Sequence, residues 1–418
     1  MKKVAIIGSG AIGLCTAYYL QKEGFEVSVI TASNKGSDNS CSFGNAGMIV
    51  PSHFIPLAAP GVIGQGVKWM LNSKSPFYIR PRFNRELFTW LKHFYASANQ
   101  GNVDRSKHLI KNLNEESRDL FEEISKHENL DFKFERKGLM MLYKTEKYQD
   151  SEEHMAAMAK KMGLSVHVKS KNELSEIEKE LNPNVLGGVL YESDAHIVPD
   201  LFMKQMEELL HQKGVKFHYS SAVTGFSKGL YKINSIHTSK EEIETDEVVV
   251  CAGSLSSDLV KELKIKIPMQ GGKGYSLTLP NVSRNLNHPT ILCEAKIAMT
   301  PMGDSLRVAG TMEIAGNDFS VNMKRLEGIK EKVPEYFYNF KEAWFSGVKP
   351  WVGLRPVTPD GLPYIGRVYD WTNVTINTGH AMMGMSLAPI SGKIVSEILM
   401  RKKSSVDLSI LKPERFLK

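Results

Sequence analysis

The sequence predicts a mixed fold in which an α/β domain with a parallel sheet receives an inserted α+β domain with an antiparallel sheet. Three observations lead to this expectation. Residues 4–30 read as a strand, a glycine turn, a helix and a second strand. Several short apolar strands follow one another between residues 275 and 309, as in an antiparallel sheet. From residue 374 the chain closes with an apolar strand, a glycine loop and a helix.

The glycine turn near the start has the spacing of a nucleotide-binding motif. Gly8, Gly10 and Gly13 follow an apolar strand at residues 4–7 and open the helix that runs to Leu20. Gly8 allows the tight turn, Gly10 lets backbone N–H groups approach a pyrophosphate, and Gly13 lets the helix pack closely on the sheet. The pyrophosphate would lie at the positive end of the helix. The motif therefore predicts a Rossmann-like domain that binds a dinucleotide.

The hydrophobic pattern predicts further elements along the chain. Helices are expected near residues 87–95, 109–124, 200–214, 256–263, 323–332 and 388–400. Strands are expected at residues 131–135, 139–143, 186–191, 215–219, 243–251, 275–279, 291–293, 296–300, 306–309 and 374–377. From this order we expect a cofactor domain made of residues 1–57, 192–263 and 350–418, and a substrate domain made of residues 58–191 and 264–349.

The composition is that of a soluble globular protein. Hydrophobic residues make up 42% and charged residues 24% of the 418 residues, which is long enough for two domains. Lysine and arginine outnumber aspartate and glutamate 53 to 46, a mild excess that suits anionic cofactors and substrates or loose contact with anionic lipid. No basic run or motif indicates a nucleic-acid partner. The four cysteines and the histidines are scattered, so we expect no metal site, no disulfide framework and a cytoplasmic setting.

Residues 61–96 are basic and aromatic, and they allow two interpretations. The segment could dock on the inner face of a membrane and pass electrons to a quinone. Alternatively it is a helical cap of the substrate domain whose aromatic side chains lie in the core. We favour the cap, because the apolar stripe is helical and is interrupted by Pro76 and Pro81.

The residues that follow the second strand argue against an ordinary NAD site. Such a site has an acidic residue there to hold the adenosine ribose, whereas this chain has Thr31, followed by Ala32 and Ser33. The hydroxyl of Thr31 or Ser33 could take that place. The ribose contact therefore stays open at this point.

Two later glycine stretches are candidates for further nucleotide contacts. Ala252 and Gly253 end a buried strand, where small residues allow a second backbone approach. Gly379, Gly384 and Met385 belong to a loop that opens the last helix, and its N–H groups could face the pyrimidine oxygen of a flavin. Taken singly, each stretch is more often an ordinary turn.

Several longer motifs carry a resemblance to a known family. They are residues 40–47 (SCSFGNAG) with Pro51, 58–61 (AAPG), 68–69 (KW), 273–276 (KGYS), 353–361 (GLRPVTPDG) with Gly366, and 377–380 (NTGH), beside the N-terminal glycine unit. With them the chain resembles the FAD-dependent D-amino-acid dehydrogenases, within the wider group of D-amino-acid oxidase, glycine oxidase and sarcosine oxidase. The resemblance covers nearly the whole length. It departs from the family pattern at Thr31 and at the methionine-rich residues 382–385.

The resemblance implies a flavoprotein that binds FAD and oxidises an amine next to a carboxylate. A hydride would pass from the substrate Cα to flavin N5, and the imine would hydrolyse to a keto acid or remain cyclic. Arg355 resembles the family arginine that binds the substrate carboxylate. The residues implied to lie along the flavin pyrophosphate and ring are Ser42, Gly44, Asn45, Ala46 and Gly47.

Four side chains are candidates for lining the pocket or contacting the substrate. The planar guanidinium of Arg355 suits a carboxylate, although a structural ion pair is the alternative. The phenol of Tyr275 could donate to the carboxylate or close the pocket, or the ring could pack in the core. His380 and His53 could line the pocket, and for His53 we favour a structural role.

The sequence leaves competing functions open. The main hypothesis is an FAD-dependent dehydrogenase of a D-amino or D-imino acid, and the alternative is an oxygen-using oxidase of the glycine or sarcosine type. An NAD-dependent dehydrogenase and a nucleotide-sensing module are further alternatives. The amino acid, the electron acceptor (a quinone or oxygen), covalent attachment of the flavin and the oligomeric state are not determined by the sequence.

Overall fold

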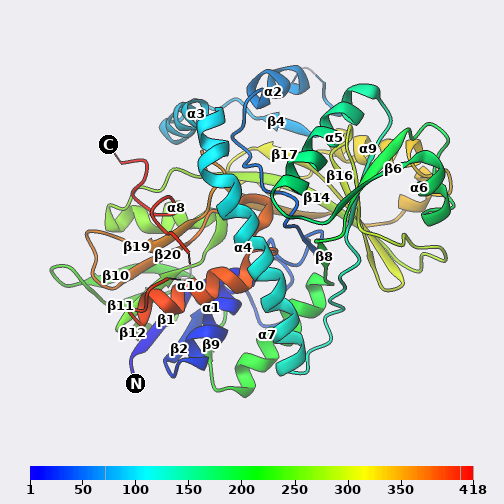
Figure 1. Ribbon diagram of the computed structural model, residues 1–418. Coiled ribbons are helices and arrows are strands. Elements are labelled where there is room, and N and C mark those ends of the chain that lie inside the picture. The colour runs from blue at the N-terminus through cyan, green and yellow to red at the C-terminus, as the bar shows by residue number, and fades with distance from the viewer. Residues whose placement is uncertain (71, 405, 418) are drawn as a thin grey trace.

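The computed structural model describes residues 1–70, 72–404 and 406–417, and it contains two large sheets (Figure 1). The first sheet has the order β19-β20-β13-β1-β2-β9. Its strands are β1 (Lys3–Ile7), β2 (Glu26–Ile30), β9 (Lys216–His218), β13 (Glu247–Val250), β19 (Tyr364–Arg367) and β20 (Val374–Thr378). All neighbours in this sheet are parallel except β19, which pairs antiparallel with β20 at one edge. This is the parallel sheet that the glycine motif predicts.

Alternating side chains of β1 bury the two faces of this sheet. Val4 and Ile6 pack with the helices on one face, and Ala5 and Ile7 pack in a separate core on the other face. The helical face is covered by α1 (Ala11–Lys22), α4 (Gln100–His127), α7 (Pro199–Gln212) and α10 (Ala388–Leu399). The opposite face is covered by a three-stranded sheet of β10 (Val223–Lys228), β11 (Ile233–Thr238) and β12 (Glu242–Glu244).

The second sheet has nine strands, in the order β18-β14-β17-β16-β15-β5-β7-β6, with β4 added beside β17. These strands are β4 (Phe77–Ile79), β5 (Leu139–Tyr143), β6 (Val166–Ser170), β7 (Gly187–Tyr191), β14 (Gln270–Leu279), β15 (Thr290–Leu292), β16 (Ile297–Met302), β17 (Ser305–Ile314) and β18 (Trp351–Val357). It is antiparallel apart from the pairs β15/β5 and β17/β4. The expected antiparallel sheet is thus present, with two parallel pairings.

Six further α-helices and one strand pair lie around the two sheets within the described residues. The helices are α2 (Val62–Met70), α3 (Arg85–Ser97), α5 (Glu146–Lys161), α6 (Lys171–Ile177), α8 (Ser256–Leu259) and α9 (Met323–Lys332). A two-stranded pair joins β3 (Met48–Ile49) to β8 (Ala195–His196). Within the described residues, no helix is both long enough and apolar enough to cross a lipid bilayer.

Two predicted strands differ from the structure. Residues 131–135 form only an isolated bridge from Glu135 to His196, because Lys133 has φ +55°, which an extended strand does not allow. The predicted strand 243–251 is divided into β12 and β13. Between them the N–H of Asp246 donates a hydrogen bond to the carbonyl oxygen of Lys3. Strand β12 pairs with β11, and strand β13 pairs with β1.

Two elements pack with a different sheet from the one that the expected division into two domains assigns to them. Strand β18 was expected in the cofactor domain, yet it is an edge strand of the nine-stranded sheet. Helix α4 was expected in the substrate domain, yet Ile110, Leu113 and Phe121 pack in the core beside α1 and α10. The division into two domains stays a prediction.

The segment 61–96 contains the helix expected near residues 87–95, as α3, together with α2 and the strand β4, but it lacks the expected aromatic core. Leu87 and Trp90 are the buried side chains of α3, whereas Phe83 is 99%, Phe88 56% and Tyr95 74% exposed. The expectation that the aromatic side chains lie in the core is therefore wrong for these three. The segment lies at one end of the molecule, where α2, α3 and β4 are neighbours (Figure 1).

Candidate functional site

A cavity of about 1070 Å³ lies where the two sheets meet. Its walls come from the carboxyl ends of β1, β2 and β13 on one side, and from β14, β17 and β18 on the other. In open parallel sheets, ligands bind outside the carboxyl ends of the strands. The volume exceeds that of an ordinary small-ligand pocket, which is about 300–1,000 Å³.

The glycine turn shapes the end of the cavity beside α1. Gly8 has φ +116°, and a Cβ atom there would lie 2.4 Å from the carbonyl oxygen of Cys251. A Cβ on Gly13 would lie 1.9 Å from the carbonyl oxygen of Gly8. Gly10 is the N-cap of α1 and has no side chain of its own to cap the helix. The positive end of the helix faces the cavity, and no carboxylate of the described residues is bonded to it.

Residues 42–47 form a loop that is held against both sheets. The hydroxyl oxygen of Ser42 accepts a 2.9 Å hydrogen bond from Ala11 N–H at the start of α1. From β17, Arg307 donates to the carbonyl oxygens of Phe43 and Asn45, at 2.7 and 2.9 Å. Asn45 also closes its own turn, because its Oδ1 accepts from Gly47 N–H at 2.8 Å. The loop is thereby fixed in place along the cavity.

The indole ring of Trp351 packs so closely against this loop that only glycine fits at position 44. A Cβ on Gly44 would lie 1.9 Å from the ring of Trp351, and one on Gly353 would lie 2.0 Å from the same ring. Trp351 thus fits between the loop and its own strand. Larger residues at either position would displace the wall of the cavity.

At the end of β2, two hydroxyl groups replace the acidic residue of an NAD site. Thr31 Oγ1 accepts hydrogen bonds from Ser9 Oγ at 3.0 Å and from Ser33 N–H at 3.2 Å. The hydroxyl of Ser33 donates to Asn39 Oδ1 at 2.8 Å. Thr31 and Ser33 both line the cavity, and neither brings a negative charge to it.

Hydrogen bonds from two hydroxyl groups connect the end of β13, near Ala252, with the end of β20, near Gly379. Thr378 donates to the carbonyl oxygen of Gly253 at 3.1 Å, and Ser256 donates to Thr378 at the same distance. Ala252 and Gly253 line the cavity. Gly379 has φ +82°, and its Cβ would lie 2.6 Å from Thr358, so it shapes the backbone behind the wall.

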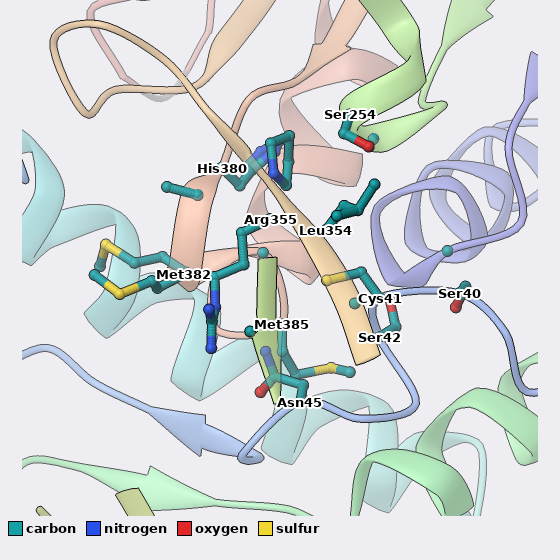
Figure 2. Close-up of a pocket in the computed structure, with 18 of the residues that line it drawn as sticks. Ser40, Cys41, Ser42, Asn45, Ser254, Leu354, Arg355, His380, Met382 and Met385 are labelled. Carbon is teal, nitrogen blue, oxygen red and sulfur yellow. The ribbon is translucent and has the colours of Figure 1, made fainter. Parts of the chain in front are cut away.

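Arg355 places an unpaired guanidinium group in the cavity. It lies on β18 and donates from Nη1 to the backbone carbonyl of Thr311 at 2.7 Å. Within the described residues it has no carboxylate partner, and burial lowers its pKa from the ordinary arginine value. Figure 2 shows the side chain extending away from Leu354 into the part of the cavity where Met382 and Asn45 also lie. A buried, unpaired cation of this kind suits an anionic ligand.

Of the roles that the sequence left open for Tyr275, the structure favours an aromatic ring packed at the cavity wall. Its hydroxyl donates to Glu313 at 2.5 Å and accepts from Asn322 N–H at 3.0 Å. Burial and the hydrogen bond to Glu313 raise the pKa of the phenol well above its ordinary value. Because the single phenolic proton is held by Glu313, it is not available to a substrate carboxylate. Tyr275 lines the cavity as a packed aromatic residue, 1% exposed.

His380 is a neutral histidine on the cavity wall. Burial lowers its pKa to about 3, and its Nε2 forms a 2.9 Å hydrogen bond with Ser391. Its Nδ1 is buried and has no partner within the described residues. The histidine therefore carries no charge at neutral pH, and it offers one ring nitrogen for a further hydrogen bond.

Most of the predicted site residues line this one cavity. They are Gly8, Gly10, Thr31, Ser33, Ser42, Gly44, Asn45, Ala46, Ala252, Gly253, Tyr275, Arg355, His380, Gly384 and Met385. Gly13, Gly47 and Gly379 lie outside the lining and act on the backbone behind it.

The cavity also has polar residues that the sequence did not single out as functional. Cys41 lies close enough to Arg355 for the guanidinium charge to act on its thiol. Lys296 and Thr311 come from the nine-stranded sheet and its turns. His53, which we expected to be structural, lies on the wall as well. No motif marks Lys296 or Thr311, because each reaches the cavity through the folding of distant strands.

The residues present fit a dinucleotide that carries a flavin. A helix N-terminus that begins at a glycine N-cap, a glycine turn that excludes Cβ atoms and the fixed 42–47 loop follow one another along the wall. The wall then continues to Arg355 and His380. The cavity is thus suited to a long anionic cofactor at one end and a small anionic ligand at the other.

Comparisons with known proteins agree with this site. Two proteins called D-amino acid dehydrogenase are each 31% identical to this chain. The one from Mesorhizobium japonicum covers 100% of both chains, and the one from Vibrio atlanticus covers 99% of this chain and 100% of its own. The fold is also that of glycine oxidase from Geobacillus kaustophilus, with a TM-score of 0.79, 19% identity and full coverage of both chains. L-proline dehydrogenase from P. horikoshii has a TM-score of 0.74 at 18% identity and covers 99% of this chain and 97% of its own.

The family follows from a match over almost the entire chain. Residues 3–398 match the model of the FAD dependent oxidoreductase family named DAO. The resemblance found in the sequence is confirmed, as are the FAD cofactor and the mixed α/β fold. The protein belongs to the DAO family of FAD-dependent oxidoreductases.

Proposed function

We propose that the protein is an FAD-dependent dehydrogenase of a D-amino or D-imino acid. One observation carries the choice of an amino acid: the buried guanidinium of Arg355 faces the cavity without a carboxylate partner in the described residues. Such a group holds a substrate carboxylate through two parallel hydrogen bonds. The names of the full-length relatives, at 31% identity, support the D configuration.

The chain contributes orientation and exclusion of water. Arg355 would hold the carboxylate, and its own position is fixed by the Thr311 carbonyl, so that the substrate Cα is presented at one place. Apolar lining residues such as Met312, Met383 and Ile291 would keep water from the reacting carbon. Bound FAD would supply the acceptor, flavin N5, for the hydride that leaves Cα. The imine product then hydrolyses to a keto acid, or it stays cyclic when the substrate is a proline.

For the cofactor we propose a set of contacts along the wall. The pyrophosphate would lie at Gly10 and the N-terminus of α1, beside the hydroxyl of Ser42. The adenosine ribose would be met by the hydroxyl groups of Thr31 and Ser33. The other residues proposed to touch or shape the flavin site are Gly8, Gly13, Gly44, Asn45, Ala46, Gly47, Ala252, Gly253, Gly379, His380, Gly384 and Met385.

The test is anaerobic reduction of the bound flavin. The purified holoenzyme is mixed with single D- and L-amino acids, prolines and N-methylated amino acids included, and loss of the flavin absorbance is followed. A D-amino or D-imino acid should bleach the flavin, and its L enantiomer should not. Bleaching by glycine or sarcosine with fast reoxidation by oxygen would instead support the oxidase alternative. If no amino acid reduces the flavin, the proposed function is wrong.

For the electron acceptor we propose a quinone reached by peripheral contact with an anionic membrane. Phe83 and Phe88 are exposed beside the basic residues Arg80, Arg85 and Lys92. Exposed aromatic and basic side chains together favour the interface of an anionic bilayer. The protein should sediment with vesicles of anionic lipid, and the double variant Phe83→Ser/Phe88→Ser should not. Equal sedimentation of both proteins would contradict the contact.

A further inference from the structure

A chain of hydrogen bonds leads from the cavity to a buried carboxyl group. Asp194 is 0% exposed and follows β7, while Ser52 and His53 follow β3. Asp194 accepts from Ser52 N–H at 3.0 Å and from the Ser52 hydroxyl at 2.5 Å. The Ser52 hydroxyl oxygen in turn lies 3.0 Å from Nδ1 of His53, which lines the cavity.

The direction of the hydrogen bonds follows from counting protons. The Ser52 hydroxyl has one proton, and the ionised carboxylate of Asp194 can only accept it. The Ser52 oxygen must therefore accept from His53, so Nδ1 carries the proton of the neutral imidazole. Nε2 of His53 then has a lone pair, and within the described residues no group donates to it. His53 thus presents a proton acceptor to the cavity.

We propose that His53, Ser52 and Asp194 form a proton relay that accepts the proton of the substrate's ammonium group. This inference rests on the proposed function. The ammonium proton passes to His53 Nε2, the Nδ1 proton passes to the Ser52 oxygen, and the Ser52 hydroxyl proton passes to Asp194. Three N–H or O–H bonds break and three form, with no change of oxidation state. The substrate amine becomes neutral, as loss of a hydride from Cα requires, and Asp194 becomes a carboxylic acid.

The surroundings of His53 and Asp194 favour proton transfer from the substrate toward Asp194. Burial raises the pKa of Asp194 to about 7, although the Ser52 hydrogen bonds and the charge of Arg118 act the other way. Burial, with the nearby cation of Lys296, lowers the pKa of His53 to about 4. Tyr191, which ends β7, is the other titratable group near Asp194. His53 therefore transmits a proton without keeping it, and Asp194 is the group that can hold it near neutral pH.

A purely structural role for Asp194 explains the hydrogen-bond chain from Asp194 through Ser52 to His53 less well than a proton relay does. Within the described residues Asp194 forms no ion pair, and a buried carboxylate without a cation is costly to keep. Arg118 is near, but it pairs with Asp119 and donates to the Ser193 carbonyl at 2.6 Å. The hydrogen-bond chain also ends at the cavity wall instead of in the core.

The experiment is the pH dependence of anaerobic flavin reduction in the holoenzyme, with the best amino acid from the panel above. We expect Ser52→Ala and Asp194→Asn to slow reduction by about 10²-fold at pH 7. Above the pKa of the substrate's own amine the substrate is already neutral, so both variants should approach the wild-type rate. Ser52→Thr keeps the hydroxyl and should retain the wild-type profile. Ser106→Ala is the matched control, since it removes a buried hydroxyl that donates to the Asn102 carbonyl.

A second measurement needs no variant. In wild-type protein labelled with carboxyl-¹³C aspartate, the infrared difference spectrum on reduction should show a new protonated carboxyl band that shifts with the label. Absence of this band, or a Ser52→Ala deficit that is zero or equal at all pH values, would overturn the relay. These outcomes leave the proposed function intact as long as wild-type flavin is bleached. Failure of the proposed function is seen separately, as wild-type flavin that no amino acid reduces.

Discussion

The guanidinium group of Arg355 lies directly against the α-carbon of Gly274 on the neighbouring strand. A Cβ atom at position 274 would be 2.0 Å from Nη1 and 2.4 Å from the central carbon of the guanidinium. The two residues are on paired strands, because β14 and β18 run antiparallel with Lys273 opposite Leu354. The absence of a side chain at Gly274 is therefore what allows Arg355 to reach the Thr311 carbonyl.

Gly274→Ala should therefore displace the guanidinium and weaken substrate binding. We expect KM for the amino acid to rise by about tenfold or more, with a smaller change in kcat, because a hydrogen bond between the guanidinium and the carboxylate contributes about 1.5–3 kcal/mol to binding. Steady-state assays with an artificial dye would measure both constants. Gly64→Ala is the matched control, since a Cβ there meets no atom within 4 Å. An unchanged KM for Gly274→Ala would separate Arg355 from the substrate site.

Arg355→Lys tests the guanidinium itself. The ammonium of lysine keeps the charge but cannot form two parallel hydrogen bonds with a carboxylate. A hydrogen bond to a charged group contributes about 1.5–3 kcal/mol, so we expect KM to rise about 10- to 150-fold. Competitive inhibition by a carboxylate without an amine should weaken by the same factor. If the inhibitor binds equally well to both proteins, the carboxylate lies elsewhere.

The sequence was most informative where function depends on local backbone geometry. Gly8 and Gly13 could be assigned from spacing alone, because a tight turn and close helix packing each require glycine. The apolar run Val4-Ala5-Ile6-Ile7 likewise predicted a strand, and the structure buries this strand on both faces. Arg355 was found through a motif that a proline fixes. In each case the signal and the structure lie within a few residues of one another.

Contacts between residues that are far apart in the sequence could not be predicted in the same way. The sequence left open whether Tyr275 donates to the substrate or packs in the core, and the contact that bears on this choice is with Glu313, 38 residues further along the chain. The hydrogen bond between Ser52 and Asp194 joins positions 142 residues apart. The positive φ of Lys133, which prevents the strand expected at residues 131–135, leaves no mark in the hydrophobic pattern. Such features depend on how the two sheets are placed together.

Retention of FAD should depend on the Ser42 hydroxyl. Its oxygen accepts from Ala11 N–H, and its proton has no acceptor within the described residues, so it can be donated to the cofactor pyrophosphate. Removing one such hydrogen bond to a charged group costs about 1.5–3 kcal/mol, so Ser42→Ala should weaken FAD binding at least about tenfold. Flavin release during dilution or dialysis, followed by fluorescence, measures this. Ser73→Ala, at an exposed serine, should release flavin like the wild type.

The carboxyl group of Glu178 should make folding stability depend on pH. Glu178 is 6% exposed at the end of α6, and its Oε1 accepts from Asn287 N–H at 2.7 Å and from His288 N–H at 3.3 Å. Burial raises its pKa from 4.5 to about 7, although these hydrogen bonds act the other way. A carboxyl group whose pKa is higher in the folded state binds its proton more tightly there, so it favours folding at low pH. Its contribution is complete below pH 4.5 and is lost as pH rises to about 7, a change of about 3 kcal/mol.

Glu178→Gln has no such titration, so its free energy of unfolding relative to wild type should rise between pH 4.5 and pH 8. Chemical denaturation at the two pH values measures the difference. Glu176→Gln, at an exposed glutamate two residues away, is the matched control, and a difference for Glu178→Gln that is equal at both pH values would contradict the raised pKa of the Glu178 carboxyl group.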